Sequence, residues 1–145
     1  MTAEDLRKVS GGVIGQFTPK EVLVDYTQLN SAADKSINLF VPKGKLVIGG
    51  YIKTVETPDT EGSNSATLRI KVGDTAIGSG ALTVVTSGTG ANVGAYQPVL
   101  TDLGTAPEAD NIPSAIYTTA ETEVKLTVGS NGLTAGKFRV GVLYI

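Results

Sequence analysis

The amino-acid sequence predicts an all-β protein, a two-sheet antiparallel sandwich of the jelly-roll type with an extended N-terminal arm. Valine, isoleucine and threonine make up 43 of the 145 residues, and these β-branched side chains lose rotamer freedom in helices but pack well on pleated sheets. Eighteen glycines and six prolines interrupt the chain at short intervals, as the turns of antiparallel sheets require. An immunoglobulin-like sandwich is the alternative, although its cysteine and tryptophan hallmark is absent.

The chain divides into an N-terminal arm with the first short strands (residues 1–36) and a β-sandwich (residues 37–145). A length of 145 residues predicts one compact body. Residues 1–11 contain the one candidate helix, which is too short to be stable in isolation. The segment is therefore either a frayed terminus or an arm that only a partner orders. Short strands are expected over Gly11–Phe17 and Lys20–Asp25, on either side of Thr18 and Pro19.

Alternating apolar side chains and turn residues define the strands of the sandwich. A strand over Ile37–Val41 is expected to end at Pro42, where Pro42–Gly44 has the composition of a tight turn. The longest strand, Leu46–Glu56, is apolar on both faces in its first half, with Leu46, Ile48 and Ile52 on one face, and this pattern predicts a central position. Further strands are expected at Ala66–Val72, near Ala76, and at Leu82–Val85, Ala115–Thr118, Val124–Val128 and Lys137–Ile145, with polar loops over residues 30–36, 57–65 and 86–114.

The C-terminal strand has an unusual ending. Its first part is amphipathic, with alternate residues facing the core, but Leu143 and Ile145 then make the opposite face apolar as well. This pattern is compatible with a central strand of the sandwich. A contact between subunits is the alternative interpretation, and the central strand is the favoured one.

The composition excludes many chemical mechanisms. The chain contains no cysteine and no histidine, which excludes thiol nucleophiles, disulfides, zinc fingers and imidazole catalysis. With a net charge of −2, the chain lacks the surplus of positive charge that nucleic-acid-binding proteins usually carry. The chain contains no run of 18 apolar residues, so no membrane span is expected, and the N-terminus lacks the apolar region of a secretory signal. We therefore expect a protein that is not an enzyme and that binds no cofactor, nucleic acid or membrane.

Binding of a sugar or calcium by a β module is an alternative that the residues leave open. Tyr96 and Tyr117 lie in or near loops and could stack on a sugar or a base, although ordinary surface tyrosines are the favoured interpretation. Paired carboxylates supply the oxygen ligands that calcium prefers, yet no calcium-loop motif is present. Solvated loop acids are the favoured interpretation for these pairs: Asp59 and Glu61, Glu108 and Asp110, and Glu121 and Glu123.

The charges are distributed unevenly along the chain. Between Lys71 and Lys125 there is no lysine or arginine, and this stretch carries a charge of −6. If folding preserves the asymmetry, an acidic surface could align copies of the subunit. The alternative is that interleaved strands mix the two signs.

From residue 37 onward the chain resembles the small all-β virion proteins of tailed bacteriophages, in particular head decoration (capsid cement) proteins. The resemblance rests on an apolar-Pro-x-Gly opening, an alternating strand and a Leu-Thr-Ala-Gly ending followed by alternating Val and Tyr. It covers about two thirds of the chain, and its motifs consist mostly of turn and core residues. The segments that carry it are Leu39–Tyr51, Ser65–Asp74 and Leu133–Ile145.

The resemblance implies a structural role in a virion. Proteins of this kind bind the outer surface of the capsid and stabilise it, commonly as homotrimers, with the major capsid protein as partner. It implies assembly in the host cytoplasm and a final location on the capsid exterior; a tail, fibre or adaptor component is the alternative. Candidate partner contacts are the apolar residues of the arm and of the C-terminus: Leu6, Val9, Val13, Ile14, Phe17, Leu143 and Ile145.

Overall fold

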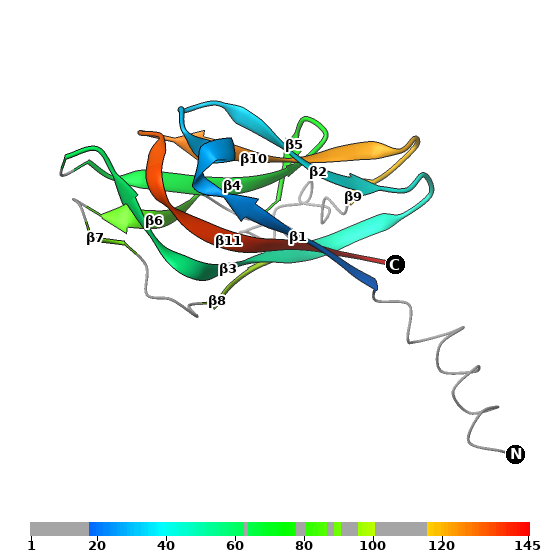
Figure 1. Ribbon diagram of the computed structural model, residues 1–145. Helices are drawn as coiled ribbons and strands as arrows, with labels where there is room; N and C mark the ends of the chain where they lie inside the picture. The colour runs from blue at the N-terminus through cyan, green and yellow to red at the C-terminus, as the bar shows by residue number, and fades with distance from the viewer. Residues whose placement is uncertain (1–17, 63, 78–80, 87–88, 91–95, 101–115) are drawn as a thin grey trace, which may run out of the picture.

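The protein folds as two antiparallel sheets packed face to face (Figure 1). The structure, a computed structural model, describes residues 18–62, 64–77, 81–86, 89–90, 96–100 and 116–145. Within these residues no helix is long and apolar enough to span a lipid bilayer. The elements are β1 (Thr18–Asp25), the 3₁₀ helix η1 (Tyr26–Leu29), β2 (Asp34–Val41), β3 (Leu46–Thr60), β4 (Ala66–Val72), β5 (Thr75–Ala76), β6 (Leu82–Thr86), β7 (Thr89–Gly90), β8 (Tyr96–Leu100), β9 (Ile116–Tyr117), β10 (Thr122–Gly129) and β11 (Leu133–Tyr144).

The order of the strands confirms the jelly roll. Sheet A has the order β1-β11-β3-β8, with β9 beside β3, and sheet B has the order β2-β10-β4-β6-β7, with β5 beside β4. The main strands pair in nested fashion, first with last: β1 with β11, β2 with β10, β3 with β8 and β4 with β6. Successive pairs alternate between the two sheets. This nesting of antiparallel pairs is the two-Greek-key arrangement of a jelly roll.

The core lies between the two sheets and follows the alternation that the sequence predicts. On β11 the inward positions hold Phe138, Val140, Val142 and Tyr144, all of them buried. Sheet B contributes a second set of buried apolar side chains from β4 and β10, with the polar residues between them facing outward. The predicted turn at Pro42–Gly44 is also confirmed, with Gly44 at a φ of +79°, a conformation that glycine adopts without strain.

The predicted faces of β3 are wrong because the strand contains a β-bulge. Val47 lies opposite Tyr144 and Gly49 lies opposite Leu143, so Ile48 is an extra residue on the β3 side of the ladder. The bulge shifts the alternation by one residue. Val47 and Ile52 are therefore buried together, whereas Ile48 is only half-buried.

The prediction that a loop starts at residue 57 is also wrong, because β3 continues to Thr60. Asp59 and Thr60 still pair with the first residues of β11. The register shifts between Lys137 and Ala135, so Pro58, which has no N–H to donate, has no partner in the ladder.

Residues 18–36 belong to the sandwich, so the expected boundary between residues 36 and 37 falls inside β2. β1 pairs with β11 along its whole length, from Thr18 opposite Tyr144 to Asp25 opposite Lys137. Local sequence does not reveal this pairing because the two strands lie at opposite ends of the chain. The expected helix over residues 1–11 and the expected strand over Gly11–Phe17 lie outside the described residues.

Candidate functional site

Apolar side chains lie together on the outer face of sheet A, at the end where β11 terminates. The backbones of Leu46 and Ile145 exchange two hydrogen bonds of 2.9 Å, and Tyr117 lies directly opposite Leu46 on β9. Residues directly opposite one another in an antiparallel pair share a face of the sheet. Leu143 lies two residues before Ile145 and points to the same side. We call Leu46, Tyr117, Leu143 and Ile145 the terminal patch.

The terminal patch faces solvent. The chain neighbours of the patch residues, Val47 and Tyr144, are buried in the core, and strand alternation therefore turns the patch outward. The side chain of Tyr117 is 62% exposed and that of Ile145 is 43% exposed, while Leu46 and Leu143 are half-buried. Adjacent exposed apolar side chains of this kind are typical of a surface that binds a protein partner.

A buried hydroxyl group holds the patch in place. Thr118 is 2% exposed, and its hydroxyl donates to the carbonyl oxygen of Pro42 at 2.6 Å and accepts from the backbone N–H of Lys45 at 2.9 Å. The backbone of Thr118 also bonds to Gly44 and Lys45. These bonds tie β9 to the turn between β2 and β3, so Tyr117 is displayed on a fixed backbone.

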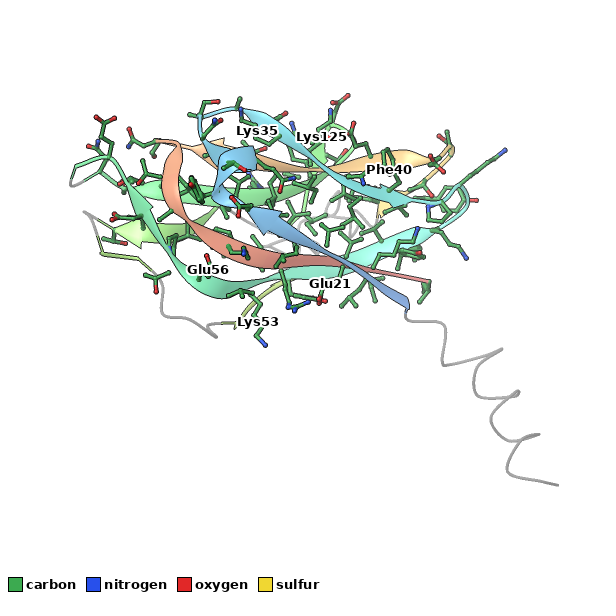
Figure 2. The ribbon with its side chains drawn as sticks, in the orientation of Figure 1. Glu21, Lys35, Phe40, Lys53, Glu56 and Lys125 are labelled. Atoms are coloured by element: carbon green, nitrogen blue, oxygen red, sulfur yellow. The ribbon has the colours of Figure 1, made fainter. Side chains whose placement is uncertain are left out.

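Beside the patch, the outer face of sheet A becomes polar. The ring of Tyr51 crosses Gly141, where a Cβ atom would lie 2.4 Å from the ring, and its hydroxyl donates to the carboxylate of Glu21. Arg139 donates to the same carboxylate at 3.0 Å. Figure 2 shows Glu21, together with Lys53, on this side of the sandwich. Side chains from three adjacent strands are thus joined across the sheet.

Sheet B carries a second polar network on its outer face. Asp34 accepts hydrogen bonds from the hydroxyl of Thr127 at 2.6 Å and from the ammonium group of Lys71 at 2.9 Å. Ser36 donates to Glu123 on the neighbouring strand. Both signs of charge therefore lie side by side in this network. Of the acidic stretch between Lys71 and Lys125 the network includes only Glu123, and Asp102, Glu108 and Asp110 lie outside the described residues.

The stability of the protein is expected to fall in acid because of these two networks. The hydrogen bond from Tyr51, followed by the hydrogen bond and charge of Arg139, lowers the pKa of Glu21 below its ordinary value of 4.5. The bonds from Thr127 and Lys71 lower the pKa of Asp34 below 3.8. Both carboxylates therefore bind a proton more readily in the unfolded chain than in the folded protein. Their stabilisation is complete at a pH above the ordinary pKa values, and it is lost as the pH falls through the lowered pKa values of the folded protein.

Urea unfolding at pH 7 and pH 3 measures this effect. The Glu21→Gln and Asp34→Asn variants should lose less stability between the two pH values than the unaltered protein does, because they lack the titrating group. Parallel pH dependence in all three proteins would contradict the assignment.

The structure describes two of the predicted partner-contact residues and brings them together. Leu143 and Ile145 both lie in the terminal patch, whereas the predicted contacts of the arm, Leu6, Val9, Val13, Ile14 and Phe17, lie outside the described residues. Sequence reasoning missed Leu46 as a contact residue and assigned it to a strand face, and it interpreted Tyr117 as an ordinary surface tyrosine, with a stacking platform as the alternative. The pairing of β3 with both β9 and the C-terminus unites these residues, and no local pattern signals it.

The described residues contain no cluster of three or more acidic side chains that could hold a metal ion. Of the acidic pairs singled out in the sequence, Asp59 accepts a hydrogen bond from the N–H of Thr60 at 2.8 Å, and Glu123 accepts from Ser36. Glu108 and Asp110 lie outside the described residues.

Comparison with known proteins gives a match in fold. No protein-family model and no curated protein sequence matches the chain. A chain of the capsid asymmetric unit of cyanophage Pam1 superposes with a TM-score of 0.52 and 21% sequence identity, over 88% of this chain and 83% of that chain. The two proteins share a fold.

Chains from structures of infectious bursal disease virus match more distantly. The Gx strain gives a TM-score of 0.26 at 13% identity, and the T13 particle gives 0.27 at 13% identity. This chain covers 31% and 30% of those larger chains.

Proposed function

We propose that the protein is a structural component of a phage virion that binds the outer surface of the capsid and stabilises it, acting as a homotrimer. The observation that carries this proposal is the jelly-roll fold shared with a chain of the cyanophage Pam1 capsid asymmetric unit, because the match spans 88% of this chain and 83% of that one. The sequence resemblance to decoration proteins over residues 37–145 is a second, independent support.

The outer face of sheet A suits a role that depends on adhesion. A decoration protein stabilises the assembled shell by mass action, because it binds the shell and not the separate subunits. Full burial of Tyr117 and Ile145 would contribute at most about 1.5–3 kcal/mol for each side chain before ordering costs. We propose that the protein works through such contacts, with no catalytic turnover and no cofactor.

A tail, fibre or adaptor component is the alternative location, since a jelly-roll fold serves equally well there. The capsid-surface proposal and the tail proposal differ in which part of the particle carries the chain. Binding to the shell is therefore the measurement that separates them.

The purified chain is expected to cosediment with empty shells of the phage that encodes it. Binding should saturate at a fixed stoichiometry and raise the melting temperature of the shell, because the ligand stabilises only the assembled state. Fully decorated particles, whose sites are occupied, serve as the control and should bind no additional chain. Failure to cosediment, or cryo-EM density on the tail alone, would contradict the proposed location.

A further inference from the structure

We propose that Asn131 is a site of spontaneous deamidation whose rate the fold controls. The native turn suppresses the reaction, unfolding releases it, and the modified chain does not regain the turn. This inference goes beyond the proposed role in a virion and does not depend on it. It concerns how long a copy of the chain remains able to fold.

The dipeptide Asn131-Gly132 has the chemistry that deamidation requires. It is the only Asn-Gly pair in the sequence. The backbone nitrogen of Gly132 loses its proton and attacks the side-chain carbonyl carbon of Asn131, which closes a five-membered succinimide ring and expels the side-chain nitrogen as ammonia. Water then opens the ring to aspartate, or to isoaspartate, in which the main chain runs through the former side chain. Glycine has no Cβ atom to hinder the attack, so this asparagine meets less hindrance than the others of the chain.

Hydrogen bonds hold Asn131 in the turn between β10 and β11. Its side-chain Nδ2 donates to the carbonyl oxygen of Ser65 at 2.8 Å, and its backbone N–H donates to the carbonyl oxygen of Gly129 at 2.9 Å. Ring closure expels the same nitrogen that donates to Ser65. The reaction in the folded protein would therefore remove a donor from a partly buried carbonyl oxygen, and this loss opposes it.

The packing around Gly132 is a second restraint. A Cβ atom on Gly132 would lie 2.2 Å from the carbonyl oxygen of Asn30 and 2.6 Å from the backbone nitrogen of Ser31, so two backbone segments are in direct contact here. A planar ring between residues 131 and 132 changes the path of the main chain, and the neighbouring backbone leaves no room for that change. Ring closure therefore requires the turn to open, or the protein to unfold.

Both products of the reaction lack what holds the turn. An aspartate at position 131 has no N–H to donate and places a carboxylate beside the carbonyl oxygen of Ser65. An isoaspartate also adds a methylene group to the main chain immediately before Gly132, where the backbone of Asn30 blocks any displacement. A copy that reacts while it is unfolded therefore does not recover the native turn, and its unfolding becomes irreversible.

The position of the turn makes the damage relevant to the whole of sheet A. β11 begins at Leu133, directly after Gly132, and Leu133 is buried opposite Thr60 of β3. β11 lies between β1 and β3, so a displaced turn disturbs the first residue of a central strand. Figure 1 shows this turn at the end of the sandwich away from the C-terminus, and hence away from the terminal patch.

Peptide mapping of the natural protein tests the protection. The protein is incubated in mildly alkaline buffer with and without guanidinium chloride, and trypsin then releases residues 126–137, in which Asn131 is the only asparagine. The mass gain of amide hydrolysis in this peptide should appear about tenfold faster or more in the denaturant, because the folded turn no longer restrains it. The synthetic peptide of residues 126–137 is the control for the solvent and should react at similar rates in both solutions. Equal rates in folded and unfolded protein, or no modification of the unfolded protein, would overturn the inference.

Refolding of the incubated protein tests the fate of the product. Chain diluted from the denaturant at once should refold fully, whereas after incubation the modified peptide should be concentrated in the fraction that size-exclusion chromatography separates from native protein. The same share of modified peptide in the native fraction would show that the product fits the turn, and the inference would be wrong.

A substitution that mimics one product gives a second measurement. Asn131→Asp should have a lower melting temperature than Asn64→Asp, which makes the same change of charge in the neighbouring loop. The side chain of Asn64 donates to the carbonyl oxygen of Glu61 within that loop and ties no separate segments together. If the two variants melt at the same temperature, the bond from Asn131 to Ser65 does not hold the turn, and the proposed restraint is wrong.

Discussion

Phe138→Ala is expected to lower the free energy of unfolding by about 3–5 kcal/mol. Phe138 is the largest fully buried side chain among the described residues and lies on β11, between Val24 of β1 and Thr54 of β3. Truncation removes its transfer free energy and leaves a cavity that β-strands bonded on both sides cannot close. Since domains are stable by only about 5–15 kcal/mol, the variant should be close to unfolding at elevated temperature.

Urea unfolding followed by circular dichroism measures the loss. Phe40→Ala is the matched control, because Phe40 is 38% exposed on the outer face of β2 and should cost less than about 1 kcal/mol. Equal losses in the two variants would contradict the position of the core.

Gly132→Ala should destabilise the protein by about 1–3 kcal/mol or more, because it forces two backbone segments apart. A Cβ atom on Gly132 would lie 2.2 Å from the carbonyl oxygen of Asn30 and 2.6 Å from the backbone nitrogen of Ser31. Both contacts are to backbone, so no side-chain rotation relieves them. The turn between β10 and β11 and the segment between η1 and β2 would have to separate.

A second substitution in the same turn serves as the control. Ser130 has a φ of +69°, and Ser130→Gly should change the free energy of unfolding by no more than about 1 kcal/mol, because relief of the left-handed strain offsets the added chain entropy. Thermal unfolding of both variants measures the difference. If Gly132→Ala is no more costly than Ser130→Gly, the close approach of the two segments is wrong.

The sequence by itself determined the fold class and most of the strands. Alternation of period two is a local property, and it identified β4, β10 and β11 with their buried faces because each of these strands has one face in the core and one in solvent. The turn at Pro42–Gly44 was equally predictable, since proline and glycine restrict the backbone locally.

The tertiary structure alone decided which strands pair, where β3 carries its β-bulge and which residues form the terminal patch. The extra residue Ile48 inverts the faces of β3 by lengthening the strand against β11, and no local signal marks it. The terminal patch exists because Tyr117 on β9 and Ile145 at the C-terminus both pair with Leu46. Leu46 is far from both of these residues in the sequence. Strand pairing is selected by burial and by contacts across long loops, whereas residue propensity reports only the immediate neighbours of each position.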